Sequence, residues 1–148
     1  MRQIQRTLNI ESSGIGFYEI TEEIALWLRR IAAKNGLLTL FIRHTSASLT
    51  IQENADPDVQ RDLLEAFDRL APQNMPYHHR SEGPDDMPAH IKGALTDVSL
   101  SIPVSNGEAV LGTWQGIFVV EHRTRPRERQ VVLHFQGDAG HEPEFEME

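Results

Sequence analysis

The stretch VSLSIPVSNGEAVLGTWQGIFVVEHRTRPRERQVVLHFQ, residues 98–136, decides the fold class of this chain. Apolar residues alternate with serines over 98–102, which is typical of a half-buried strand, and the SNGE sequence at 105–108 predicts a tight hairpin turn. Further strands are expected over 109–113, 117–122 and 130–136. Successive strands are expected to pair antiparallel, since that is the economical topology.

The N-terminal half reads as strand, helix, strand, helix. The expected elements are a strand over 4–10, a helix over 22–34, a strand buried on both faces over 37–43, and a helix from Pro57 that is capped by Asp56 and ends before Pro72. Residues 72–88 form a long loop, and 87–92 read as one or two helical turns. A mixed half followed by a run of strands predicts an α+β domain rather than a doubly wound sheet.

Composition predicts one cytoplasmic domain. The chain has 148 residues, enough for a single sizeable core, with no apolar run long enough for a membrane span and no apolar signal core at its start. Its net charge of −8 argues against a nucleic-acid partner, although five of the acidic residues lie in 138–148. We expect a domain over 1–137 and a disordered acidic tail over 138–148.

The absence of cysteine directs attention to the seven histidines, because a metal would need imidazole, carboxylate or backbone oxygen ligands. His44 begins HTSAS, residues 44–48, where a strand leaves the core. These hydroxyls and amides suit an anion, or they satisfy the turn itself. The following ENAD, residues 53–56, precedes a helix N-terminus that also favours an anion, although Asp56 is explained by capping alone.

The loop YHHRSEGPDDMPAHIK, residues 77–92, is the densest polar segment. It holds three histidines, one glutamate, two aspartates and two basic residues, a set that suits a metal or a phosphate. No compact metal motif such as HExxH is present, so a solvated polar loop explains the same composition.

The segment GTWQG, residues 112–116, indicates a bulge or a close backbone approach, and Trp114 either packs in the core or stacks on a flat ligand. Glu121 shares a strand face with apolar residues, where a carboxylate needs a partner, and Arg123 is the candidate. His122 and His134 are expected at the surface or at an interface.

Three long segments, HTSASLTIQENADPDVQRD at 44–62, YHHRSEGPDDMPAHIKGAL at 77–95 and LGTWQGIFVVEHR at 111–123, resemble the YjbQ-like family in order and separation. The resemblance covers about residues 3–137. It implies a compact α+β fold with a mostly antiparallel, sandwich-like sheet core and two to three helices, assembly as a homotrimer, and sites near subunit boundaries. It also implies weak thiamine-phosphate synthase activity, and it favours His79 over His78.

On this basis the site is expected to hold a divalent ion, zinc or magnesium, or a phosphate through His44, His79 and His90. Asp86 would orient a ligating imidazole, and Glu121 would fix Arg123 or a ligand amine. The full expected set is catalytic His44, His79, His90 and Glu121, with ligand-binding Thr45, Ser46, Ser48, Asn54, Asp86, Lys92, Trp114, Gln115 and Arg123. The expected partner is a phosphorylated metabolite. A non-catalytic trimeric binder and a metal-assisted hydrolase are the alternatives.

Overall fold

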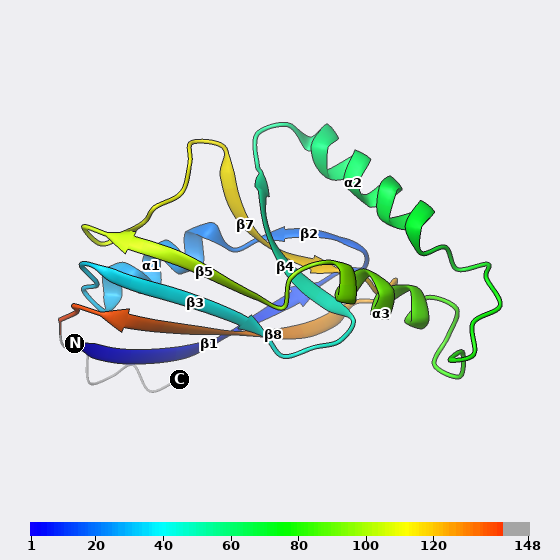
Figure 1. Cartoon of the computed structure of the whole chain (residues 1–148), viewed down its shortest axis with the longest axis horizontal. Helices are drawn as coiled ribbons and strands as arrows, with labels where there is room; N and C mark the ends of the chain where they lie inside the picture. The colour runs from blue at the N-terminus through cyan, green and yellow to red at the C-terminus, as the bar shows by residue number, and fades with distance from the viewer. Residues whose placement is uncertain (141–148) are drawn as a thin grey trace.

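The computed structural model describes residues 1–140, and it confirms a single α+β domain with three helices and antiparallel sheets (Figure 1). The strands are β1 (Arg2–Ser12), β2 (Gly16–Glu19), β3 (Gly36–Ile42), β4 (Ala47–Glu53), β5 (Ser99–Ser105), β6 (Glu108–Ala109), β7 (Gln115–Glu121) and β8 (Arg127–Gly137). The helices are α1 (Thr21–Arg30), α2 (Pro57–Leu70) and α3 (Asp86–Leu95).

Five strands form one sheet in the order β1-β8-β3-β5-β6. Its inner face supplies much of the core, including Leu38, Leu40, Leu133 and Phe135, each with no exposed area. β3 was expected to be buried on both faces, and that prediction is wrong: Leu37 is 38% and Phe41 47% exposed. No other described element covers the outer face, so β3 alternates like an ordinary antiparallel strand.

The second sheet contains three strands in the order β2-β7-β4. β7 pairs with β2 and β4, both far away in sequence, so the prediction of successive pairing fails for this strand. Both partners are short segments that periodicity did not predict as strands. The predicted hairpin at the SNGE turn is confirmed. There β5 and β6 pair through a turn at Asn106 and Gly107, both of which have positive φ.

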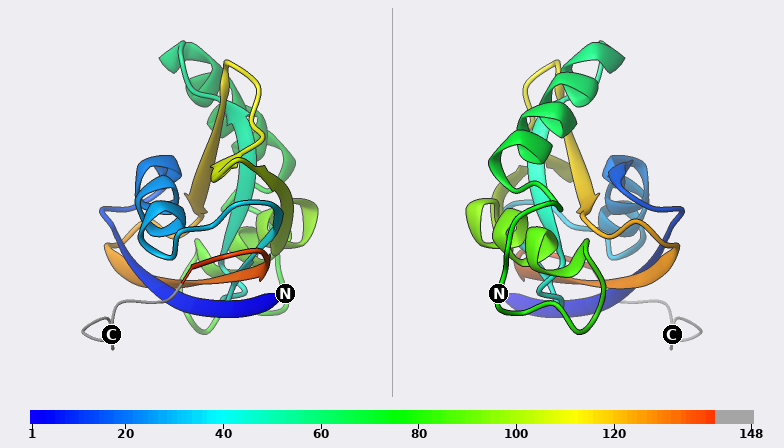
Figure 2. Two further views of the ribbon diagram at one scale, coloured as in Figure 1. Left: turned by 90° about the vertical axis from the view of Figure 1, so that its left-hand side faces the viewer. Right: turned by 90° about the vertical axis from the view of Figure 1, so that its right-hand side faces the viewer.

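The helices differ in how firmly they are held. α1 lies over the inner face of the five-stranded sheet and buries Ile24, Trp27 and Leu28, whereas α2 lies beside the three-stranded sheet next to β2 and buries none of its side chains fully (Figure 2). The Asp56 side chain accepts a hydrogen bond from the amide of Asp58, which confirms the predicted cap of α2.

Residues 141–148, most of the expected acidic tail, lie outside the described residues. The chain just before them is bonded to the end of α1, because the amide of Gly140 donates to the carbonyls of Ile31 and Ala32. Among the described helices, none is long and apolar enough to cross a membrane.

Candidate metal centre

Four side chains meet at the start of α3. Asp86 and His90 lie one helical turn apart and therefore share a face of the helix, and His79 and Glu82 reach them from the preceding loop. One ligand atom from each residue lies within 4.8 Å of the other three. Two imidazoles and two carboxylates form a donor set that suits zinc or another first-row divalent ion.

Asp86 is the centre of this cluster. Its Oδ2 lies 2.7 Å from His79 Nε2 and 3.2 Å from His90 Nε2, and Glu82 Oε2 lies 3.4 Å from His79 Nε2. Asp86 is buried, whereas His79 and Glu82 are exposed, so the cluster opens to solvent on the loop side.

The hydrogen bond at Nδ1 of His90 determines which nitrogen of the neutral ring carries the proton. His90 Nδ1 lies 3.2 Å from the carbonyl oxygen of Thr45, to which it can only donate. A neutral His90 therefore turns the lone pair of Nε2 toward the carboxylate of Asp86. Two lone pairs at that distance repel each other unless a proton or a cation lies between them. Such an outer hydrogen bond is also how metal-binding imidazoles are usually oriented.

Arg123 fixes the other side of the carboxylate. Its guanidinium donates to Asp86 Oδ1 at 2.6 Å and to Asp85 Oδ2 at 2.9 Å, with all three side chains nearly buried. Burial raises the pKa of Asp85, but hydrogen bonds from Arg123 and Thr124 outweigh that effect and hold it at about 2. The pKa of Asp86 is also lowered: burial opposes the change, and the hydrogen bond to His79 and the charge of Arg123 outweigh it.

His44 lies outside the four-residue cluster, and both of its nitrogens have neighbours. Nε2 accepts a hydrogen bond of 2.8 Å from the amide of Gln130, so a neutral ring carries its proton on Nδ1, which lies 3.3 Å from Arg129. Burial and the charge of Arg129 lower its pKa.

His44 and His90 both line one cavity. Its volume is about 470 Å³, and its wall comes from the chain before β4 and from α3, including Thr45, Gly93 and Thr96. A second cavity of about 480 Å³ also borders His44 and adds Arg43 and Arg129. A ligand in this region would therefore lie beside the four-residue cluster, with cationic groups nearby.

Glu121 is fully buried, and its side-chain partner is Arg129 rather than the expected Arg123. Ser12 also donates to it at 2.7 Å, whereas Arg123 contributes only its backbone amide. Burial raises the pKa of Glu121, but the hydrogen bonds from Arg129 and Ser12 outweigh this and lower it. Arg129 also donates to Ser46. The ion pair of Glu121 and Arg129, with its hydrogen-bond partners Ser12 and Ser46, therefore lies directly beneath His44.

The other expected site residues separate into two places. Ser48 on β4 and Lys92 on α3 are both buried, and Ser48 bonds to His122. Asn54, Trp114 and Gln115 lie at the opposite end of the β4–β7 pair, about 20 Å along the strands at about 3.3 Å per residue. Trp114 is 63% exposed, so it is not a core residue.

Sequence reasoning missed several participants. Glu82 was noted in the polar loop but was not assigned as a ligand, although its spacing from His79 places both on one turn. Arg129 and Ser12 gave no local signal, because only the pairing of β1 with β8 brings them together. His122 was expected at the surface or at an interface and is instead 1% exposed, because Phe67 of α2 packs on its ring.

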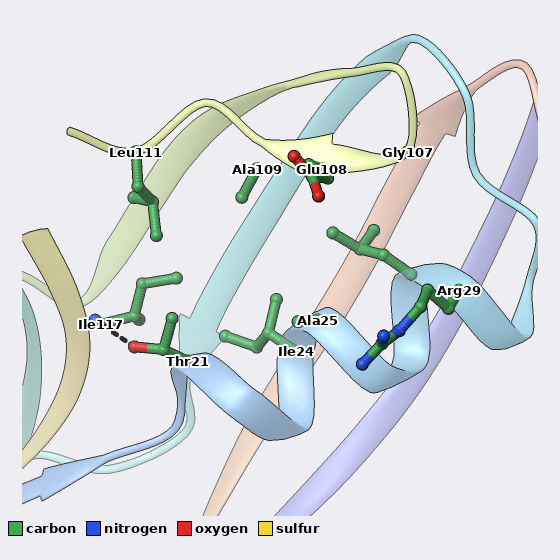
Figure 3. Close-up of a pocket in the computed structure, with 10 residues that line it drawn as sticks. Thr21, Ile24, Ala25, Arg29, Gly107, Glu108, Ala109, Leu111 and Ile117 are labelled. Carbon is green, nitrogen blue, oxygen red and sulfur yellow. Dashed lines mark hydrogen bonds between the residues drawn. The ribbon is translucent and has the colours of Figure 1, made fainter. Parts of the chain in front are cut away.

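A separate apolar pocket of about 290 Å³ lies between α1 and the β5–β6 hairpin (Figure 3). Ile24, Leu111 and Ile117 line it, and the hydroxyl of Thr21 accepts a hydrogen bond from the amide of Ile117. It shares no lining residue with the histidine cluster.

The fold and the cluster define a small antiparallel α+β protein with a His- and carboxylate-lined centre at the start of one helix. The model of the family described as "UPF0047 protein YjbQ-like" matches residues 6–138. The chain belongs to this family.

Known relatives match this chain over nearly its full length. UPF0047 protein sll1880 of Synechocystis is 49% identical over 138 residues, covering 93% of this chain and 94% of the relative. UPF0047 protein YjbQ of Escherichia coli O157:H7 is 44% identical over 135 residues, covering 90% and 98%. The crystal structure of a YjbQ/UPF0047 family protein from Clostridium acetobutylicum has a TM-score of 0.79 at 38% identity, covering 90% of this chain and 99% of that one. These names state no activity, so the thiamine-phosphate synthase prediction stays a proposal.

Proposed function

We propose that this protein binds a divalent metal ion, preferentially zinc, through His79, Glu82, Asp86 and His90. The observation that carries the proposal is the convergence of two imidazoles and two carboxylates, with one ligand atom from each residue within 4.8 Å of the other three. Imidazole ligands favour zinc over magnesium, which prefers oxygen ligands and bound waters. His44 takes part as a wall of the ligand cavity.

We further propose that the ligand is a phosphorylated small molecule and that the reaction is a transfer of the thiamine-phosphate synthase type. In that reaction the bond from carbon to diphosphate oxygen breaks, and the thiazole nitrogen forms the new bond to carbon. The chain contributes position and charge: Arg43 lines the second cavity beside His44, and Arg123 holds Asp86 in place. A divalent ion supplies positive charge that stabilises a departing diphosphate.

Metal titration tests the first half of the proposal. Isothermal titration with zinc should give one tight site in the wild type. Replacing His79 or His90 by Ala should lower the zinc affinity at least about tenfold, because losing a ligand costs at least as much affinity as losing a residue that orients one. His78→Ala is the matched control, because His78 is adjacent but lies outside the cluster. Unchanged affinity in both ligand variants would reject this metal centre.

Turnover tests the second half. Purified zinc-loaded protein is incubated with the pyrimidine diphosphate and the thiazole phosphate, and thiamine phosphate is measured by chromatography. Product that depends on His79 and His90 supports the transferase. Tight metal binding with neither product nor release of inorganic phosphate would favour the binding-module alternative, and phosphate release alone would favour a hydrolase.

A further inference from the structure

The apolar pocket between α1 and the β5–β6 hairpin is a concave site of its own (Figure 3). Ile24, Leu28 and Ile117 line it and are each at most 1% exposed, so they form its floor. Ala109 and Leu111 are half-buried and form its wall on the hairpin side. The volume of about 290 Å³ lies at the lower end of the range of about 300–1,000 Å³ that is usual for ligand pockets. The lining and the size therefore suit one small apolar group.

Two side chains of opposite charge border this pocket. Arg29 extends from α1 and Glu108 from the hairpin, so a cation and an anion lie on its two sides (Figure 3). Both residues are exposed, and neither side chain makes a hydrogen bond or an ion pair with any residue of 1–140. Both charges are therefore available to a ligand whose apolar part lies in the pocket.

The hairpin offers a third polar group, the backbone amide of Ala109. The amide of Val110 donates to the carbonyl of Pro103, so these two residues form a hydrogen-bonded pair. Bonded and non-bonded pairs alternate along an antiparallel ladder, so the next pair, Val104 and Ala109, is non-bonded and the Ala109 amide points away from β5. β6 is the last strand of its sheet, so this amide lies at an unpaired edge beside the pocket.

The two charges decide which kind of small molecule fits. A hydrocarbon would use neither charge, and a simple carboxylate or amine would use only one of them. An α-amino acid carries a carboxylate, an ammonium and a side chain on a single carbon, so it can use both charges and place an apolar side chain between them.

We propose that this pocket binds a free α-amino acid with an apolar side chain, such as leucine. The carboxylate accepts hydrogen bonds from the guanidinium of Arg29 and from the amide of Ala109, and the ammonium donates to Glu108. The side chain contacts Ile24 and Leu28 on the floor of the pocket. This site is independent of the proposed metal centre, because the two share no residue.

Isothermal titration with leucine and three related compounds separates the parts of this recognition. L-Leucine should give one saturable site. Isoamylamine lacks the carboxylate and isocaproate lacks the ammonium, so each should bind at least about tenfold more weakly, because each loses a hydrogen bond between charged groups. L-Asparagine keeps both charges but has a polar side chain, so it should not bind at concentrations that saturate with leucine. The absence of a saturable leucine site, or equal affinity for leucine and isoamylamine, would overturn the proposal.

Variants show whether leucine lies in this pocket. Arg29→Gln should lower the affinity for leucine about tenfold and leave that for isoamylamine unchanged, because isoamylamine has no carboxylate. Glu108→Gln should likewise weaken leucine and leave isocaproate unchanged. Both positions are exposed, so these replacements leave the core intact. Arg69→Gln and Glu65→Gln, exposed changes on α2, are the controls and should bind leucine as the wild type does.

Two results would contradict this assignment of contacts. Wild-type affinity for leucine in both Arg29→Gln and Glu108→Gln would place the amino acid elsewhere on the protein. Equal losses for leucine and isoamylamine in Arg29→Gln would show that the guanidinium does not bind the carboxylate.

Discussion

At the scale of single residues, the interior of this protein holds an unusual number of charged and polar side chains. Two buried networks pair Asp86 with Arg123 and Glu121 with Arg129, so none of these four charges lacks a partner. His122 differs, because its only side-chain hydrogen-bond partner among residues 1–140 is the Ser48 hydroxyl. Burial, followed by the charge of Lys92, lowers the pKa of His122 from its ordinary 6.5 to about 4.

This shift predicts a pH dependence of stability. Because the folded pKa lies below the unfolded one, the unfolded chain gains a proton first as the pH falls, so the stabilisation is complete above pH 6.5 and is lost toward pH 4. Between pH 7 and pH 5 the loss is on the order of 2 kcal/mol. Chemical denaturation at both pH values measures it. His122→Gln should show a smaller difference between the two pH values, and an identical difference would contradict the pKa argument.

At the scale of elements, α3 and α2 have different roles. α3 is anchored through Asp86, Ala89 and Lys92, and one of its faces carries Asp86 and His90, two of the proposed metal ligands. α2 relies on its Asp56 cap and on Phe67, which stacks near Phe17 and His122. An element with so little burial depends more on its own local signals than a packed helix does.

The cap of α2 should therefore be measurable. Asp56→Ala removes the hydrogen bond to the amide of Asp58 and should destabilise the helix by about 1 kcal/mol. Hydrogen exchange should accelerate across α2 while the amides of the five-stranded sheet stay protected. Asp62→Ala, an exposed change within the same helix, is the control. Uniform acceleration throughout the protein would show that α2 unfolds only together with the whole domain.

At the scale of the whole molecule, apolar side chains remain exposed on one chain. Leu70, Leu95 and Trp114 are each more than 60% exposed, and the outer face of β3 presents Phe41. Together with the incompletely buried α2, these surfaces support the proposal that copies of the chain assemble.

We expect a homotrimer, as the resemblance to the family implies. Sedimentation equilibrium at micromolar concentration should give three times the chain mass of 16.8 kDa. Leu70→Glu should shift the distribution toward the monomer if α2 lies at the interface, with Leu26→Glu, on an exposed position of α1, as the control. A wild-type mass of 16.8 kDa would disprove assembly.

The sequence by itself determined the elements whose signals are local. Several features could be predicted because each depends on residues close together in the chain. They are the cap and length of α2, the SNGE turn, the last strand β8 and the polar loop around His79. Only the tertiary structure decided which strands pair, and therefore that Arg129 rather than Arg123 neutralises Glu121. It also separated His44 from the cluster of His79, Glu82, Asp86 and His90, and it buried His122 and Lys92, because burial depends on which distant segments cover a side chain.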